Sequence, residues 1–190
     1  MSINEQSIQA ALQAVIDPNT GKDLVASRSV KNIKINGNDV ALDVELGYPA
    51  KSQIDGLRAA VIDALKALPG IGNVSANVFS KVVTHAVQKG VKLIPGVKNI
   101  IAVASGKGGV GKSTTAVNLA LALAAEGATV GLLDADIYGP SLPTMLGIPT
   151  GRPESADGKS LEPMDAHGIQ AMSIGFLIDP EQPMVWRGPM

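Results

Sequence analysis

A glycine-rich run from Gly106 to Ser113 holds the residues whose types and spacing most directly suggest chemistry. Its letters, GKGGVGKS, fit the pattern G-x-x-x-x-G-K-[S/T] of a phosphate-binding loop. Glycines let several backbone N–H groups surround phosphate oxygens, the Lys112 ammonium matches the β- and γ-phosphates, and the Ser113 hydroxyl can ligate Mg²⁺. The residues expected to contact the nucleotide are Gly106, Lys107, Gly108, Gly109, Val110, Gly111, Lys112, Ser113 and Thr114.

The segments on either side of this run fit a strand–loop–helix unit. Residues 100–104 form a short continuous apolar run, which predicts a buried parallel strand. After the loop, apolar residues continue at helical spacing from Val117 to Leu123, and Gly127 is expected to end the helix. A glycine-rich turn of purely structural purpose would not need Lys112 and Ser113, so the context favours nucleotide binding.

Two carboxylates follow a second apolar run. Residues 130–133 predict another buried strand, and Asp134 and Asp136 come directly after it. The carboxyl ends of parallel strands are where α/β folds bind ligands, so two carboxylates at this spacing, one strand after the phosphate-binding loop, favour a functional site. Either carboxylate alone could instead cap a helix.

The first 79 residues predict a small α+β domain. Apolar residues recur at helical spacing over 8–16 and 54–68, and they alternate over 30–35 and 40–46, with a turn signal between the two strands. A last short strand is expected at 74–78, with both helices on one face of the sheet. Four aspartates here permit a cation site, but turn formers and a solvated strand face are favoured: Asp17, Asp23, Asp39 and Asp43.

Composition narrows the function classes. The 190 residues carry a formal net charge of −1 and 45% apolar residues, so the chain can bury a core and gives no electrostatic reason to bind nucleic acid. The absence of cysteine excludes disulfides and cysteine-held clusters within these residues. The N-terminus lacks a signal-peptide pattern and no apolar run reaches about 18 residues, so a cytoplasmic protein without membrane attachment is expected.

The charge is distributed unevenly, which predicts two domains and a linker. Residues 1–98 carry 11 basic and 8 acidic residues, a net of +3, and residues 99–190 carry 5 and 9, a net of −4. We expect an α+β domain at 1–79, a basic linker at 80–98 and a P-loop domain at 99–190 with a mainly parallel sheet and flanking helices. The linker's lysines favour a soluble tether over a strip that contacts a partner: Lys81, Lys89, Lys92 and Lys98.

These motifs together resemble the Mrp/ApbC family of iron–sulfur cluster carrier ATPases. The resemblance rests on the segments SGKGGVGKSTT (105–115), LDADIYGPS (133–141) and WRGPM (186–190), and residues 1–79 resemble the iron–sulfur-assembly domain that many bacterial members carry. Lys107 gives the loop the deviant form found in the MinD, ParA and nitrogenase iron protein class. In that class this lysine reaches the nucleotide of the dimer partner.

The resemblance implies a homodimeric ATPase that carries a [4Fe-4S] cluster to apoproteins with the help of assembly factors. Lys107, Lys112 and Asp136 would then be catalytic, and Asp136 would orient the attacking water or bond to the Mg²⁺ shell. Asp134 would fix the loop or a metal-bound water. The implied Mg²⁺ site thus consists of Ser113, Asp134 and Asp136. Family members continue with a D-x-P-P-G segment and a C-x-x-C pair that these residues lack. We therefore expect an N-terminal fragment that hydrolyses ATP weakly or not at all, with exposed apolar strand edges.

Two other functions remain open on the sequence. A spatial-regulator ATPase of the MinD/ParA kind would share the loop and Lys107, but it would be expected to carry a membrane-binding helix or a basic DNA-binding face, and neither is visible. The chain could also act mainly as an interaction module through residues 1–79.

Overall fold

The computed structural model describes residues 3–85 and 94–178 of the chain. The chain folds into two compact units, Met1–Asn99 and Ile100–Met190. Among the described helices, none has the length and apolar character needed to cross a lipid bilayer. The predicted fold class, α/β with a small first α+β domain, is confirmed.

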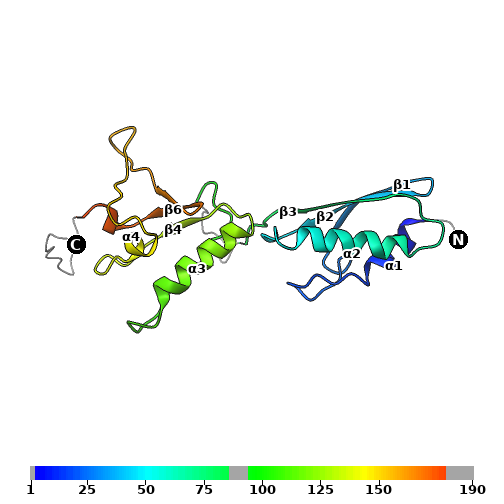
Figure 1. The fold of residues 1–190 in the computed structure, drawn as a ribbon, viewed down its shortest axis with the longest axis horizontal. Helices are drawn as coiled ribbons and strands as arrows, with labels where there is room; N and C mark the ends of the chain where they lie inside the picture. Colours follow the sequence, from blue (N-terminus) through cyan, green and yellow to red (C-terminus); the bar gives the residue numbers. More distant parts are fainter. Residues whose placement is uncertain (1–2, 86–93, 179–190) are drawn as a thin grey trace. The chain divides into compact units, whose positions relative to one another are not determined.

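The first unit has the predicted α-β-β-α-β order. Its elements are α1 (Glu5–Leu12), β1 (Val30–Asn36), β2 (Asp39–Leu46), α2 (Ile54–Lys66) and β3 (Val74–Ser80). The sheet order is β1-β2-β3, with an antiparallel pair joined by a tight turn and a parallel pair joined through α2. Both helices lie on one face of this sheet (Figure 1). The turn between β1 and β2 contains Gly37 at a φ of 61°, a conformation that favours glycine.

The core of the first unit lies between the sheet and the two helices. Alternate side chains of β2 are buried, and the alternation continues from one end of the strand to the other. They pack against the buried faces of α1 and α2. Every second side chain of the strand thus contacts side chains that recur about every 3.6 residues on one face of each helix. The residues of this core include Ile8, Leu12, Val40, Leu42, Val44, Leu46, Leu57, Val61 and Leu65.

A buried carboxylate closes the loop after α1. Asp17 is 1% exposed and accepts hydrogen bonds from the Tyr48 hydroxyl (2.6 Å), the Thr20 hydroxyl (2.8 Å) and the Asn19 backbone N–H (2.9 Å). Burial acts to raise the pKa of Asp17, but these hydrogen bonds outweigh it and lower the pKa below its ordinary value. Burial, with the hydrogen bond to Asp17, raises the pKa of Tyr48 to about 12.

The aspartates of this unit do not gather around a cation. Asp23 and Asp39 accept hydrogen bonds from backbone N–H groups, and Asp43 accepts from the side-chain amides of Asn32 and Asn77. Among the residues that the structure describes, no group of three or more His, Asp or Glu side chains could hold a metal ion. The aspartates therefore serve as turn formers and strand-face residues, as favoured from the sequence.

The segment after β3 begins attached to the first unit. The Lys81 backbone N–H donates to Leu46 (2.7 Å), that of Val83 donates to Gly47 (3.1 Å), and the Lys81 ammonium lies 3.3 Å from the Glu45 carboxylate. His85 contacts the Asn99 side chain, at 3.1 Å from Nδ1 to Oδ1. Residues 86–93 of the expected basic linker, including Lys89 and Lys92, lie outside the described residues, as does the segment 186–190, whereas 94–98 are described and form no helix or strand.

The second unit contains α3 (Lys112–Ala125), β4 (Gly131–Leu133), α4 (Leu142–Met145), β5 (Met164–Ala166), β6 (Ile169–Met172) and a 3-10 turn η1 (Ile174–Phe176). Its described sheet has the order β4-β6-β5. β4 and β6 are parallel, whereas β5 and β6 form an antiparallel hairpin. The expected mainly parallel sheet is therefore represented in the described residues by a single parallel pair.

The predicted strand at 100–104 is wrong. These residues adopt no regular secondary structure, and Ile100 and Ile101 are each more than 60% exposed. The second predicted strand forms as β4, but Leu133 is 72% exposed rather than buried. An apolar run becomes a strand only where a neighbouring strand satisfies its N–H and C=O groups, and no described strand lies beside 100–104. Apolar residues are exposed in both segments, but of the two strands expected to have exposed apolar edges only β4 forms, at one edge of its sheet.

Candidate functional site

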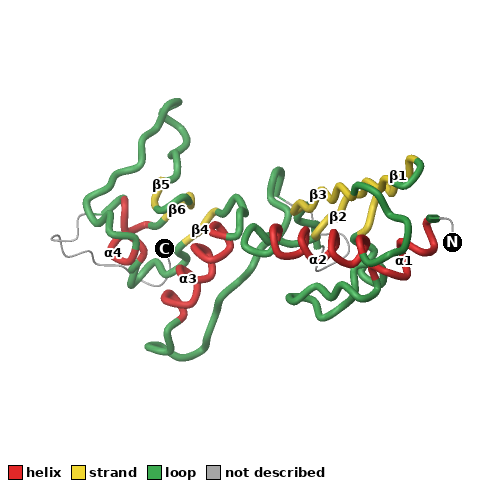
Figure 2. The backbone as a smooth tube through the Cα atoms, turned by 45° about the vertical axis from the view of Figure 1, so that its right-hand side comes forward, coloured by secondary structure: helices red, strands yellow, loops and turns green. Residues whose placement is uncertain are grey.

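A cavity of about 340 Å³ lies in the second unit between the start of α3 and the end of β4. These two elements lie side by side in both views of the fold (Figures 1 and 2). Residues 103–105, 132–136 and the first turns of α3 line the cavity, with Ser141 and Leu142 from the loop after β4. The loop before α3 and the loop after β4 therefore contribute to one site.

Glycine backbone geometry shapes the loop before α3. Gly109 and Gly111 have φ angles of 71° and 87°, which lie in the left-handed region that disfavours residues with a Cβ. Gly111 is the residue that precedes the helix, and it has no side chain to cap the first N–H groups of α3. These N–H groups and the positive end of the helix dipole both lie at the N-terminus of α3. Both favour the binding of an anion at this end of the helix.

Four of the predicted site residues share the cavity. Lys112, Ser113, Asp134 and Asp136 all line it. Lys112 and Ser113 are half-buried at the start of α3, and within the described residues the Lys112 ammonium has no ion pair. A cation, a hydroxyl and two carboxylates are thus brought together from two segments more than 20 residues apart in the sequence.

The remaining predicted residues lie in the loop or, for Thr114, in the first turn of α3, and they do not line this cavity. They are Gly106, Lys107, Gly108, Gly109, Val110, Gly111 and Thr114. Lys107 is exposed, and its backbone exchanges hydrogen bonds with the Ser105 hydroxyl.

The Asp134 carboxylate is occupied by hydrogen bonds from its own loop. Its Oδ1 accepts from the Asp136 backbone N–H (3.1 Å), and its Oδ2 accepts from the backbone N–H groups of Ser141 and Leu142 (3.2 Å each). The same Oδ2 also accepts from the Ser173 hydroxyl (3.1 Å). Asp134 therefore holds the two ends of the loop 134–142 together.

Asp136 is in a different environment from Asp134. Its side chain is exposed at the cavity, and its Oδ1 accepts a hydrogen bond from the Gly139 backbone N–H (3.0 Å). No hydrogen bond from another described residue reaches Oδ2 of Asp136. One carboxylate of the pair is thus committed to the loop, while the other presents a free oxygen.

Ser173 is a residue of the site region that sequence reasoning missed. It is 1% exposed, it follows β6 directly, and its hydroxyl accepts from the Gly175 backbone N–H (3.1 Å) while donating to Asp134. The rule that identified Asp134 could have found it, because Ser173 is also a polar residue at the carboxyl end of a parallel strand.

Comparison with known protein families gives a match in each half of the chain. Residues 96–190 match the family model described as NUBPL iron-transfer P-loop NTPase, and residues 5–78 match the one described as iron-sulfur cluster assembly protein. The model for 96–190 covers the whole of the loop and cavity described above.

Three curated relatives, each named iron-sulfur cluster carrier protein, extend the match. The Haemophilus influenzae protein is 42% identical over 98% of this chain and 50% of its own length, and the Synechocystis protein is 44% identical over 99% and 54%. The Escherichia coli protein is 69% identical over 51% of this chain and 26% of its own length. The chain spans about half the length of the first two relatives.

Among solved structures, a nucleotide-binding protein from Archaeoglobus fulgidus in complex with ADP is 49% identical in sequence over 40% of this chain and 31% of its own. Its TM-score of 0.37 means that the superposition adds nothing to the assignment of the fold. The assignment rests on the family models and on the sequence relatives. The chain belongs to the family of ParA/NUBPL iron-transfer P-loop NTPases and carries an iron–sulfur cluster assembly domain before its P-loop half.

Proposed function

We propose that the protein is an ATP-binding and ATP-hydrolysing iron–sulfur cluster carrier. The observation that carries the proposal is the convergence of Lys112, Ser113 and Asp136 on one cavity beside a glycine-rich loop that ends in a helix N-terminus. The names of the relatives support the cargo, and the match to an iron-transfer NTPase family supports its link to a nucleotide.

The donor set suits a Mg²⁺–nucleotide complex. Mg²⁺ prefers oxygen ligands, and the cavity offers the Ser113 hydroxyl and the free Oδ2 of Asp136. Lys112 would bind the β- and γ-phosphates. When bound, Mg²⁺ supplies charge neutralisation of the phosphate oxygens. Asp134 would act indirectly, because its oxygens already accept four hydrogen bonds from the loop.

We further propose that Lys107 acts in trans within a homodimer. It is exposed outside the cavity that Lys112 lines, so it is available to a second copy of the chain. A cation placed there would neutralise charge that develops on the transferred phosphoryl group of the partner's nucleotide, as an arginine finger does.

The cargo in this proposal is a [4Fe-4S] cluster that is passed to apoprotein clients with the help of assembly factors. These 190 residues contain no cysteine, so we place the thiolates that hold the cluster outside them. Nucleotide binding would favour one dimer geometry and hydrolysis would release it, which couples the nucleotide state to retention of the cluster. We place this activity in the cytoplasm, without nucleic acid or membrane as a partner.

Nucleotide binding by the whole protein tests the core of the proposal. We expect Lys112→Ala to weaken ATP–Mg²⁺ binding at least about tenfold in calorimetry, because a charged hydrogen bond contributes about 1.5–3 kcal/mol. Lys159→Ala is the matched control, since Lys159 is an exposed lysine of the same unit that does not line the cavity. Equal affinity of the Lys112→Ala and Lys159→Ala variants would overturn the proposed role of the cavity.

A further inference from the structure

The 3-10 turn η1 packs tightly against the loop 134–142 that carries Asp136. Gly175, the middle residue of η1, is buried, and two prolines lie against it. A methyl group in place of its hydrogen would lie 2.9 Å from Cγ of Pro143 and 3.2 Å from Cβ of Pro140. Carbon atoms attract best at about 3.5–4.0 Å, and a proline ring cannot swing away as a long side chain can. No side chain therefore fits at Gly175 unless a neighbouring segment moves.

Other contacts hold η1 itself in place. The Phe176 side chain is fully buried in the core of the second unit. The Arg152 guanidinium donates through Nη1 to the carbonyl oxygens of Phe176 and Ile178, at 2.8 Å each. The Gly175 N–H donates to the Ser173 hydroxyl at 3.1 Å. The turn is therefore a fixed support against which the loop after β4 lies.

The contact at Pro140 lies next to a hydrogen bond that holds Asp136. Gly139 precedes Pro140 in the chain, and its N–H donates to Oδ1 of Asp136 at 3.0 Å. Because the peptide bond between Gly139 and Pro140 is rigid and planar, movement of Pro140 also moves Gly139 and changes this hydrogen bond. The position of the Asp136 carboxylate thus depends on how closely the loop approaches η1.

The geometry points to Gly175 as a positioning residue for Asp136. Its missing side chain lets the loop 134–142 lie directly on the backbone of η1, and Arg152 contributes by holding the carbonyl groups of the turn. This role rests on the proposed function, in which Asp136 meets the Mg²⁺ of the nucleotide. A reacting group that is misplaced by about 1 Å can lose about a hundredfold in rate. Gly175 can therefore control hydrolysis although it does not line the cavity.

Gly175→Ala tests this role in the whole protein. The φ angle of Gly175 lies outside the left-handed region, so alanine adds a methyl group without backbone strain. We expect kcat for ATP hydrolysis to fall several-fold, because the methyl group displaces the loop that carries Asp136. The Kd of ATP–Mg²⁺ should change less than about twofold, because Lys112 and the loop before α3 keep their positions. Gly131→Ala is the matched control and should change neither value, since its methyl group would approach only the Gln170 carbonyl at 4.0 Å.

A second substitution distinguishes a positioning role from a general loss of stability. Pro143→Ala removes Cγ and Cδ, which are two of the three atoms that crowd a methyl group on Gly175. The double variant Gly175→Ala/Pro143→Ala should therefore regain most of the lost kcat, since substitutions that share a contact do not act independently. The role of Gly175 would be overturned by native kcat in Gly175→Ala, by an equal loss of kcat and nucleotide affinity, or by no recovery in the double variant.

A fluorine label on the loop separates this role from the proposed function. Tyr138 is a 65% exposed residue of the loop 134–142, so its fluorotyrosine resonance, assigned with Tyr138→Phe, reports the position of the loop without ATP. The resonance should shift in Gly175→Ala and stay in place in Gly131→Ala. If the native protein hydrolysed no ATP, the proposed function would fail, and a shift confined to Gly175→Ala would still support the control of the loop by η1. An unchanged resonance in Gly175→Ala would overturn that control.

Discussion

The two aspartates that follow β4 differ in what their oxygens can still bind. Asp134 accepts four hydrogen bonds that close the loop 134–142, whereas Asp136 keeps one oxygen without a described partner. From the sequence, Asp134 is already expected to fix the loop or a metal-bound water and Asp136 to act at the reacting phosphate, but spacing alone does not reveal the hydrogen-bond partners of either. In the proposed Mg²⁺ site, Asp136 would therefore meet the metal and Asp134 would position the loop that carries it.

Ser173 allows this division of roles to be tested. Removal of its hydroxyl by Ser173→Ala takes one donor from Asp134, so we expect a several-fold lower rate of ATP hydrolysis by the whole protein. The affinity for nucleotide should change less than about twofold, because Ser173 does not line the cavity. Comparison of kcat with the nucleotide Kd measures this split.

Ser160→Ala provides the matched control for that experiment. The Ser160 hydroxyl also donates to an aspartate, Asp157 (2.8 Å), but on an exposed loop away from the cavity. An equal loss of hydrolysis in both serine variants, or no loss in Ser173→Ala, would argue against a positioning role.

Tyr48 makes a prediction about alkaline pH. Its pKa is raised from 10.0 to about 12 by burial and by the hydrogen bond to Asp17, so its contribution to stability is present below pH 10 and is lost as the pH rises through about 12. Tyr48→Phe removes this contribution and leaves a buried carboxylate with fewer donors, which should cost about 1–3 kcal/mol near pH 8.

Urea unfolding of both proteins between pH 8 and pH 12 measures the effect. The difference in unfolding free energy between the native protein and Tyr48→Phe should shrink as the pH rises above 10. Other groups titrate in the same range, but they are common to both proteins and cancel in the difference. A difference that stays constant to pH 12 would contradict the proposed coupling of Tyr48 to Asp17.

At the scale of elements, the sequence was sufficient where each element finds its partner nearby in the chain. The alternation over 40–46, the turn at Gly37 and the helical period over 54–68 predicted β2, the hairpin and α2, which ends at Lys66. The segment 100–104 has an equally apolar pattern, yet it forms no strand. Periodicity reports which face of an element is apolar, but a strand also needs a neighbour to accept its hydrogen bonds.

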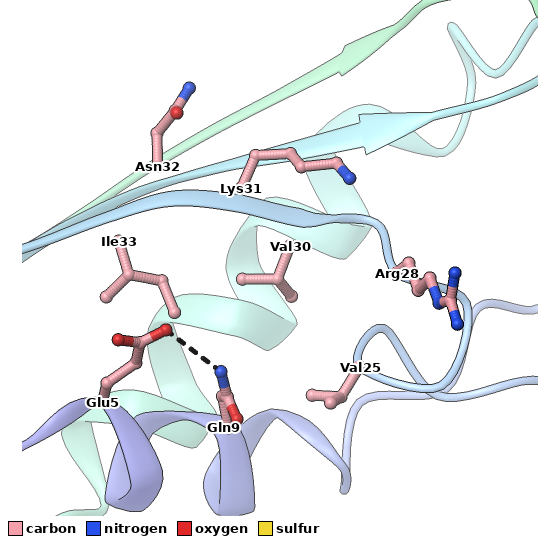
Figure 3. A pocket seen from close by; sticks show the side chains of 8 residues that line it. All are labelled: Glu5, Gln9, Val25, Arg28, Val30, Lys31, Asn32 and Ile33. Atoms are coloured by element: carbon pink, nitrogen blue, oxygen red, sulfur yellow. Dashed lines mark hydrogen bonds between the residues drawn. The ribbon is translucent and has the colours of Figure 1, made fainter.

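The part of the candidate site that could be predicted is the part whose residues are contiguous in the sequence. The loop from Gly106 to Ser113 carries its chemistry within a few residues, so its pattern could be recognised directly. Ser173 contacts Asp134 although the two are 39 positions apart, and a cavity in the first unit is lined by residues of α1 and of the segment 25–33 (Figure 3). Such sites depend on tertiary packing, which no local pattern encodes.

At the scale of the whole molecule, the two units differ in how completely their apolar residues are covered. The described first unit encloses a continuous core between its sheet and two helices. The described second unit buries a smaller cluster and leaves Ile100, Ile101 and Leu133 exposed, and Leu133 is one of the residues that line the cavity beside α3. The first unit thus covers its apolar residues more completely than the second.

The central claim is that nucleotide bound at this cavity controls release of an iron–sulfur cluster. The most direct test loads the whole protein with a [4Fe-4S] cluster and follows its transfer to an apoprotein, with and without ATP–Mg²⁺, in the native protein, Lys112→Ala and Lys159→Ala. Both substituted residues are lysines, and these 190 residues contain no cysteine, so neither substitution removes a cysteine ligand of the cluster. We predict that ATP changes the transfer rate several-fold in the native protein and in Lys159→Ala, and has no effect in Lys112→Ala. The account would be contradicted if ATP left the transfer rate of the native protein unchanged. It would also be contradicted if ATP changed the transfer rate of Lys112→Ala as much as that of the native protein.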